Sequence, residues 1–237
     1  MPIAVVLGAR NLGRAILSHL TENGWQGAAV ARSAESLEGV PGLQLQADAA
    51  DPQALRGALE RAKTELGGLD LVVNAVSASR PPAGGGPFGG GPVTDATLEG
   101  YRGWGGAVAE QTFVFLSEGA RALRAAGGHG TLVQVTGGSA RRAMAGRGLW
   151  ASGAAASRAL THAAAQELRG EGIHVALLIV DATIESPRTA AFTQGQPREA
   201  LADQADVARA VAYLASQTAR GMTHEVVLTP AGDRWLP

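Results

Sequence analysis

Short apolar runs recur along this chain, and longer stretches with helical periodicity separate them. Seven runs rich in valine, isoleucine, leucine or alanine are predicted to be strands: 3–7, 28–31, 43–47, 69–73, 131–136, 173–180 and 225–229. Most of them are continuously apolar and do not alternate with polar residues, which is typical of parallel strands covered on both faces. This pattern points to an α/β architecture.

Five stretches between these runs are predicted to be helices: 12–22, 52–66, 95–124, 151–169 and 204–217. In the first, Leu12, Ile16 and Leu20 fall on one stripe, as in a helix that packs one face on a core. The second follows Asp51 and begins at proline, which is a typical helix start. Strands that alternate with helices predict a doubly wound parallel sheet in a single domain, residues 1–237.

Composition narrows the classes of protein. The chain has 237 residues, a formal net charge of −1 and no cysteine. The length suits one domain with a sizeable core. The charge balance disfavours a nucleic-acid binder or a polybasic membrane protein, and the lack of cysteine removes disulfides, thiolate metal sites and a cysteine nucleophile. We expect a cytoplasmic protein, because there is no apolar stretch of about 20 residues and the chain runs from Met1 directly into a strand.

Two segments interrupt the alternation. Residues 81–92 hold six glycines and four prolines, and they follow the fourth predicted strand at the edge where such sheets bind ligands. This segment is either a flexible surface loop or a rim over a pocket, anchored by Phe88. The polar segment 182–203 follows the sixth strand and is a candidate lid for the same reason.

The turn after the first strand, GARNLGR at 8–14, is a candidate phosphate site. Backbone amides and the positive end of the next helix face a ligand in such a turn. The spacing of Gly8 and Gly13 also matches a P-loop. Arg14 and Ala15 then stand where a P-loop needs Lys and Ser or Thr, which disfavours an NTPase.

Motifs along nearly the whole chain, in order, resemble those of the short-chain dehydrogenase/reductase family. The resemblance implies a Rossmann-like fold with a seven-stranded parallel sheet and an NAD(P)-dependent oxidoreductase. The motifs are GARNLGRAI at 8–16, VARS at 30–33, QADAAD at 46–51, LDLVVNAV at 69–76, GTLVQVT at 130–136, ASGAA at 151–155, GIHVALL at 172–178, and the closing ADVARAVAYLAS at 205–216 with MTHEVVL at 222–228.

The resemblance implies a dinucleotide site at the ends of four strands. In the family, the first turn holds the pyrophosphate and the acid after the third strand, here Asp48, reaches the adenine. The turn after the fourth strand, here Asn74-Ala75, lies beside the adenosine. Arg32 and Ser33 stand where an acid would select NAD; a guanidinium and a hydroxyl suit a 2′-phosphate, so NADP is expected over NAD. The predicted cofactor-binding residues are Gly8, Arg10, Asn11, Leu12, Gly13, Arg32, Ser33, Asp48, Ala49, Asn74, Ala75 and Val76.

Two departures from the family pattern affect this site. The first turn is one residue shorter, and Asn11 replaces its middle glycine; asparagine tolerates a left-handed backbone better than most residues. Val76 replaces the glycine of the family's Asn-Ala-Gly turn and adds two methyl groups where the adenosine would approach. Whether the shortened turn still binds a dinucleotide is left open.

The catalytic residues of the family are missing. Its proton donor is a tyrosine four residues before a lysine, assisted by a serine on the preceding loop. Matching ASGAA to the family pattern places Leu149 at the tyrosine and Gly153 at the lysine. The serine falls at Gly137, or at Thr136 or Ser139 with another gap, and the asparagine of the proton relay falls near Val108.

Composition shows that no other alignment restores the pair. Lys63 is the single lysine of the chain, and neither tyrosine, Tyr101 or Tyr213, has a lysine near it. The catalytic residues are therefore unknown. Tyr101 is an alternative donor, with Arg141, Arg142 or Arg147 to lower its pKa, although a half-buried aromatic and solvated loop charges are the simpler interpretation. Trp150, beside the tyrosine position, is a donor only and does not titrate usefully.

The histidines give no evidence of a metal site. We interpret all five as structural or exposed, because they form no i, i+4 pair and have no acid at metal-ligand spacing; they are His19, His129, His162, His174 and His224. A triad of Ser139, His162 and Asp181 can be drawn, but the sequence around the serine is not a nucleophile elbow.

Two functions of different classes remain open. One is an NADP(H)-dependent oxidoreductase for a small carbonyl or alcohol, with water or an unusual side chain as proton donor. The other is a non-catalytic dinucleotide sensor or assembly subunit on the same fold. Small residues at 151, 155, 159 and 163 leave one helix face smooth, and the family's corresponding helix builds oligomers, so a homodimer or homotetramer is expected.

Overall fold

The computed structural model describes residues 1–77, 79–82, 87–187 and 189–233. Its strands form one parallel sheet in the order β3-β2-β1-β4-β5-β6-β7. This order reverses direction at β1, which confirms the predicted doubly wound, Rossmann-like sheet of seven strands. The strands are β1 (Ile3–Leu7), β2 (Gln26–Ala31), β3 (Leu43–Gln46), β4 (Leu71–Asn74), β5 (Gly130–Gly137), β6 (Ile173–Val180) and β7 (Glu225–Leu228).

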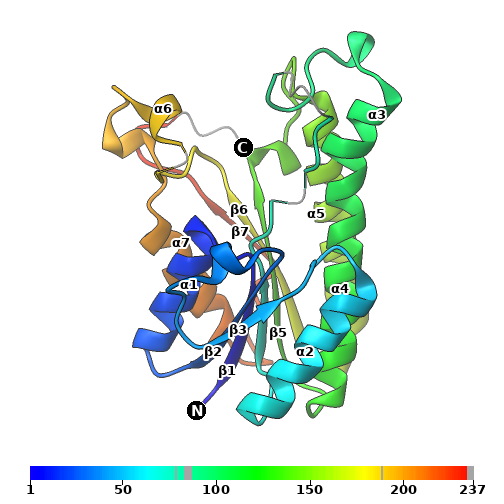
Figure 1. The fold of residues 1–237 in the computed structure, drawn as a ribbon, viewed down its shortest axis with the longest axis vertical. Coiled ribbons are helices and arrows are strands. Elements are labelled where there is room, and N and C mark those ends of the chain that lie inside the picture. Colours follow the sequence, from blue (N-terminus) through cyan, green and yellow to red (C-terminus); the bar gives the residue numbers. More distant parts are fainter. Residues whose placement is uncertain (78, 83–86, 188, 234–237) are drawn as a thin grey trace.

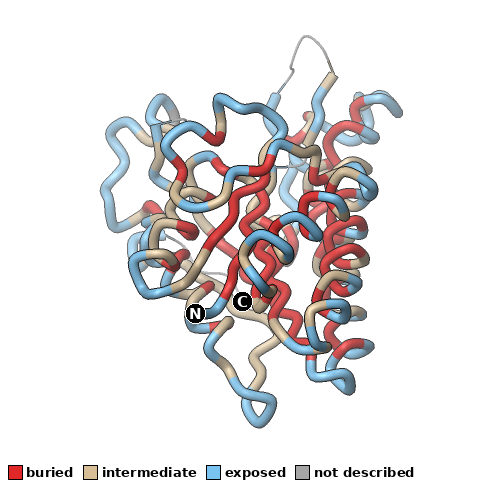
Figure 2. Tube along the Cα trace, turned by 60° about the horizontal axis from the view of Figure 1, so that its bottom comes forward, coloured by how far each residue is buried: buried red, intermediate tan, exposed pale blue. Residues whose placement is uncertain are grey.

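Helices cover both faces of the sheet (Figure 1). One face carries α1 (Asn11–Glu22) and α7 (Gln204–Ala215); the other carries α2 (Pro52–Leu66), α4 (Ala107–Ala125) and α5 (Gly148–Leu168). Strands β1 and β6 are buried at every residue, as their unbroken apolar runs predict, and Figure 2 shows the buried trace running through the middle of the molecule. Among the helices that the structure describes, none combines the length and apolarity of a bilayer span.

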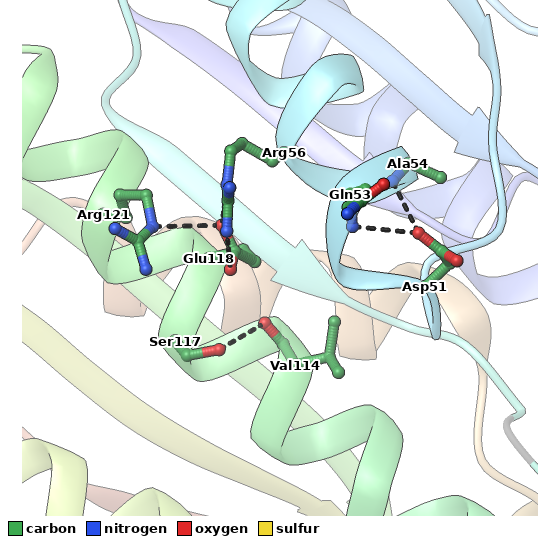
Figure 3. A network of polar contacts seen from close by, with 8 residues as sticks. All are labelled: Asp51, Gln53, Ala54, Arg56, Val114, Ser117, Glu118 and Arg121. Atoms are coloured by element: carbon green, nitrogen blue, oxygen red, sulfur yellow. Dashed lines mark hydrogen bonds and ion pairs between the residues drawn. The ribbon is translucent and has the colours of Figure 1, made fainter.

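The predicted start of the helix at Pro52 agrees with the structure. The Asp51 carboxylate accepts hydrogen bonds from the backbone amides of Gln53 and Ala54 at 2.9 and 2.8 Å, which caps α2 (Figure 3). In α1, Ile16 and Leu20 of the predicted stripe are fully buried. The apolar side chains of α1 and α7 share one core with β1, β4 and β6.

The prediction of one continuous helix over 95–124 is wrong. The structure has a short 3-10 turn η2 (Val93–Asp95), helix α3 (Leu98–Tyr101) and a π-helical turn η3 (Arg102–Gly106) before α4 begins. The cause is close backbone packing at glycines, which the pattern of apolar residues does not predict. A Cβ at Gly103 would lie 2.1 Å from the Arg80 carbonyl oxygen, and one at Gly105 would lie 2.6 Å from that of Leu149.

Shorter helical turns complete the chain. The predicted lid 182–203 contains two of them, α6 (Ala190–Thr193) and η6 (Arg198–Ala200), and the predicted end of α5 continues into η5 (Arg169–Glu171). The others are η1 (Ala34–Leu37), after β2, and η4 (Gly138–Ala140), after β5.

A charged cluster joins α2 to α4 (Figure 3). Arg56 donates two hydrogen bonds to the Glu118 carboxylate, both 2.9 Å long, and Arg121 donates a third at 3.2 Å. The Glu118 side chain is only 4% exposed. The hydrogen bonds from Arg56 hold the pKa of Glu118 below its usual range, so the carboxylate stays charged although it is buried.

Candidate functional site

The first turn contains two glycines at which the backbone packs too closely for a side chain. Gly8 has a φ of +94°, and a Cβ there would lie 2.9 Å from the Ala75 carbonyl oxygen. A Cβ at Gly13 would lie 1.5 Å from the Gly8 carbonyl oxygen. The Gly8 amide donates to the Val30 carbonyl at 2.8 Å. Side chains are therefore excluded from both positions, and the turn lies between the ends of β2 and β4.

Asn11 adopts the left-handed conformation that the shortened turn requires, with a φ of +40°. It begins α1, and the preceding residue, Arg10, supplies no side-chain cap to the helix. The Arg10 side chain is exposed and forms no ion pair with an acid in the described ranges. Leu12 is partly buried against the core that α1 covers.

Arg32 and Ser33 are exposed at the end of β2. The Ser33 hydroxyl is hydrogen-bonded to that of Ser36 at 2.8 Å. The Arg32 backbone carbonyl accepts a hydrogen bond from the Gln46 side chain at 3.0 Å, while its guanidinium has no acidic partner in the part of the chain that the structure describes. This cation is thus available to an anion at the edge of the sheet.

Asp48 lies in an ion pair that the sequence did not predict. Arg80, from the segment after β4, donates to its Oδ2 at 2.7 Å, and the Ala50 amide donates to its Oδ1 at 3.0 Å. The Arg80 amide in turn donates to the Gly103 carbonyl at 2.7 Å. An adenine at the predicted position would therefore share Asp48 with Arg80.

Asn74 is fully buried in a network of side-chain amides. Its Nδ2 donates to Gln111 at 2.8 Å and to Gln134 at 2.7 Å, and Gln111 donates at 3.4 Å to the carbonyl of Ala49, which is also buried. Sequence analysis missed both glutamines, although Gln134 interrupts an apolar strand and was a visible signal. The Asn74 side chain belongs to the interior, so this position can contact a ligand only through the turn that it supports.

The turn that follows Asn74 is held to the first strand. The Ala75 amide donates to the Leu7 carbonyl at 3.0 Å, and the Val76 amide approaches Asn74 Oδ1 at 3.4 Å. Val76 is partly buried in the core beside α2 and α4, so its methyl groups contact protein as well as the edge of the sheet.

The positions that the ASGAA motif predicts for the family's tyrosine and lysine are closed by packing. A Cβ at Gly153 would lie 2.5 Å from the Gly105 carbonyl oxygen and 2.9 Å from the Val108 Cβ, so no lysine side chain fits there. Leu149 is buried. A Cβ at Gly90 would lie 2.6 Å from Leu149 Cδ2, which shows how closely the glycine-rich segment covers this leucine.

Three aromatic rings meet beside this closed position. The Phe88 centroid lies 5.4 Å from that of Trp104 and 5.7 Å from that of Trp150, and the Arg147 guanidinium lies 5.5 Å from it. Phe88 contacts both tryptophans although it is 58% exposed, and neither interpretation of residues 81–92 is tested by these contacts; residues 83–86 lie outside the described residues. Tyr101, expected to be half-buried, is 47% exposed at the end of α3.

The Ser139, His162 and Asp181 triad does not form. His162 Nε2 lies 2.9 Å from Glu225, while the Asp181 carboxylate is bonded to Arg142 at 2.6 and 3.0 Å. His174 is buried, and burial lowers its pKa, in agreement with a structural role. Within the described ranges, no three His, Asp or Glu side chains are grouped to hold a metal ion.

Known proteins resemble this chain in sequence and in fold. The sequence model of the enoyl-(acyl carrier protein) reductase family matches residues 7–232. No curated protein sequence matches. An alcohol dehydrogenase from Thermococcus sibiricus complexed with 5-hydroxy-NADP superposes with a TM-score of 0.78 at 20% identity, covering 100% of both chains.

Two further structures share the fold. A short-chain type dehydrogenase/reductase from Mycobacterium marinum has a TM-score of 0.79 at 22% identity, covering 97% of this chain and 94% of the other. A metagenomic short-chain oxidoreductase in complex with NADP has a TM-score of 0.76 at 22% identity, covering 98% of both chains. Because the family match spans the strands and turns described above, this chain belongs to the short-chain dehydrogenase/reductase family.

Proposed function

We propose that the chain binds NADP(H) at the carboxyl ends of β1 to β4 and is an oxidoreductase with a degenerate catalytic site. The observation that carries the proposal is the pairing of a turn in which Gly8 and Gly13 have no room for a side chain with Arg32 at the next strand end, which is exposed and has no acidic partner among the described residues. Such a turn accommodates a pyrophosphate, and a guanidinium suits a 2′-phosphate.

Several features of the chain support the dinucleotide assignment. Asn11 forms the left-handed turn in place of a glycine, and Arg10 adds a second exposed cation beside it. Two structures with the same fold, at 20% and 22% identity, are complexes with 5-hydroxy-NADP and NADP. The remaining predicted contacts are those of Ser33, Asp48 and the Asn74 turn.

The chemistry divides between the cofactor and the chain. A bound nicotinamide dinucleotide supplies or accepts a hydride, and the chain's residues hold its phosphates and adenosine. With Leu149 and Gly153 at the catalytic positions, the proton for a small carbonyl or alcohol comes from water or from another side chain. Such a site forgoes the roughly 10²–10⁴-fold acceleration of a placed general acid.

Arg32→Asp tests the cofactor preference. The pure protein is titrated with NADPH and with NADH, and binding is followed by fluorescence. The substitution should weaken the binding of NADPH about 10–100-fold, because charge-assisted hydrogen bonds to the 2′-phosphate are lost. The affinity for NADH should change by less than about threefold, since NADH lacks the 2′-phosphate. Arg220→Asp, which makes the same charge change on the segment before β7, is the matched control. Equal losses for both dinucleotides would mean that Arg32 does not contact the 2′-phosphate.

A non-catalytic dinucleotide sensor or assembly subunit is the second candidate. The observation that favours it is the 2.5 Å approach of a Cβ at Gly153 to the Gly105 carbonyl oxygen, which leaves no space for a lysine. Absorbance of reduced nicotinamide, followed with a panel of aldehydes, ketones and quinones, separates the candidates. Turnover supports the oxidoreductase; NADPH binding without turnover supports the second candidate.

A homodimer or homotetramer is part of the proposal. Ala155, Ala159 and Ala163 of the small-residue stripe are exposed on α5, whereas Ala151 is buried within the chain. Phe113 of α4, the helix packed beside α5, is 58% exposed. An exposed phenylalanine on α4 and exposed alanines on the neighbouring helix α5 suit the close approach of a second copy.

A further inference from the structure

The segment that leads into β7 is attached to the sheet at the amino end of β6. In the described sheet, β7 lies at the end of the strand order and pairs with β6, and each of its four residues is partly exposed. The Leu177 amide of β6 donates to the carbonyl of His224, the residue before β7, at 2.9 Å. An edge strand has a paired strand on one side only, so its position depends on contacts of this kind.

Two histidines connect this segment to β6. His174 Nε2, from β6, donates to the Thr223 carbonyl at 2.9 Å, and His224 Nδ1 donates to the Val175 carbonyl of β6 at 3.0 Å. A carbonyl oxygen can only accept, so the proton of each neutral ring lies on the nitrogen that makes this bond. Gln217 holds Thr223 by two further hydrogen bonds, both 2.8 Å long. Two imidazole rings therefore fasten the segment in their neutral form.

The His174 ring is poorly placed to take up a second proton. It is 2% exposed, and its Nδ1 is buried without a hydrogen-bond partner in the part of the chain that the structure describes. Its centroid lies 5.8 Å from that of His224. Burial holds the pKa of His174 below its usual range; the nearby carbonyls of Thr223 and Leu214 oppose this effect, and His224 adds to it.

The groups around His174 offer it no compensating negative charge. Its neighbour on β5 is Thr131, and α7 contributes the Tyr213 hydroxyl, which lies 3.5 Å from Thr223 Oγ1. Neither His174 nor His224 forms an ion pair with an acid among the described residues. A protonated His174 would therefore be a buried cation beside a second ring that also takes up protons.

The charged groups between β7 and α5 respond to acid in the opposite direction. Glu225, the first residue of β7, accepts two hydrogen bonds from Arg158 of α5, at 2.7 and 3.0 Å. His162 Nε2, also from α5, lies 2.9 Å from the same carboxylate. A proton on His162 strengthens its attraction to Glu225, so acid does not loosen β7 from α5.

We propose that His174 and His224 form an acid-sensitive switch that holds residues 217–224 on β6 at neutral pH and releases them below about pH 6. Once protonated, the two rings repel each other, and His174 carries an N–H that the interior leaves unsatisfied. In the open segment both rings reach water, which solvates their charge. The inference goes beyond the proposed function, because it concerns the opposite edge of the sheet from the proposed dinucleotide site and requires no ligand.

Hydrogen exchange of the full chain, followed by mass spectrometry at pH 7.5 and pH 5.5, tests the switch. Exchange rates are converted to protection factors, which removes the intrinsic effect of pH on exchange. Because the pKa of His174 is lower in the closed state than in the open one, closing becomes less favourable as the pH falls below about 6.5.

The protection factors of residues 217–228 should fall about five- to tenfold at pH 5.5. Tenfold is roughly the ratio for one histidine that titrates only in the open segment, and protonation of the closed state reduces it. The amides of β1 should keep higher protection factors than those of 217–228 at both pH values, because the opening is local.

Three variants assign the effect to its residues. His174→Gln should lose the pH dependence, since glutamine keeps a donor for the Thr223 carbonyl and does not titrate. If this variant does not fold, His224→Gln replaces it and should show a smaller loss than the unaltered protein, because one of the two repelling charges is gone. His162→Gln, on the α5 side of β7, is the matched control and should keep at least the full loss.

Four results would each overturn the proposal. They are equal protection of 217–228 at the two pH values, an unchanged loss in His174→Gln, an unchanged loss in His224→Gln, and equal protection factors in β1 and 217–228 at pH 5.5, which would mean that the whole chain unfolds.

Discussion

At the residue scale, glycines decide what this site can hold. Gly8 and Gly13 bring backbone to where a phosphate would lie, and Gly153 brings α5 against the carbonyl of Gly105. The same residue type thus opens one end of the proposed site and closes the other. The loss of the family's lysine is more than a substitution, because the space for its side chain is occupied by backbone.

Gly153→Ala tests this closure. Alanine in a helix normally stabilises by about 0.5–1 kcal/mol relative to glycine. Here its Cβ would meet a backbone oxygen at 2.5 Å, and overpacking of this kind costs about 1–3 kcal/mol, so the free energy of unfolding should fall. Gly57→Ala is the matched control: Gly57 also lies inside a helix, α2, and its Cβ would meet nothing within 4 Å. Urea denaturation should show the two variants shifting in opposite directions; stabilisation of both would contradict the closure.

At the element scale, an ion pair between Arg56 and Glu118 links α2 to α4, whose other contacts are mainly apolar. Helix α2 has its own start at Asp51 and its own stop at Gly67, but its position on the sheet also depends on Glu118 of α4. The sequence predicts the two helices and their apolar faces. The pairing of Arg56 with Glu118, 62 residues apart, becomes visible only in the folded chain.

Glu118→Gln should lower the free energy of unfolding by about 1–2 kcal/mol at pH 7, because the buried carboxylate loses its charge-assisted hydrogen bonds. The pKa of Glu118 is lowered in the folded state. Its contribution is therefore fully present above the unfolded pKa of about 4.3 and is lost as the pH falls through the lower folded pKa.

The check is denaturant unfolding of both proteins from pH 7 to pH 3. The difference between them should shrink below about pH 4. Glu65→Gln, which removes an exposed i, i+4 pair with Arg61, should change stability by less than about 0.5 kcal/mol. If the difference in unfolding free energy between the unaltered protein and Glu118→Gln stayed constant with pH, the charge of Glu118 would not be what stabilises the contact between α2 and α4.

At the scale of the whole molecule, the proposed assembly would use the exposed face of α4 and α5. Ala159→Arg places a long charged side chain in the middle of the exposed alanine stripe. We expect this variant to have a lower molar mass than the unaltered protein by light scattering coupled to size exclusion. Ala219→Arg, at an exposed position before β7, should leave the mass unchanged. A monomeric unaltered protein, or a variant of the same mass, would contradict assembly through this face.

Much of the architecture was accessible from the sequence alone. The unbroken apolar runs predict parallel strands covered on both faces, and the order of motifs indicates the family. Composition alone excludes a Tyr-x3-Lys pair, since a single lysine far from both tyrosines allows no alignment to restore it. These inferences succeed because periodicity, turn chemistry and residue counts are local or global properties of the chain that need no coordinates.

Tertiary structure decided what each predicted residue contacts. It pairs Asp48 with Arg80, buries Asn74 among glutamines and, in the part of the chain that the structure describes, leaves Arg141 Nη1 without an acceptor. It also breaks the helix expected over 95–124, because glycines there pack against carbonyl groups of distant segments. The physical reason is common to all of these: hydrogen bonds, ion pairs and close backbone contacts join residues that only the packing of helices onto the sheet brings together.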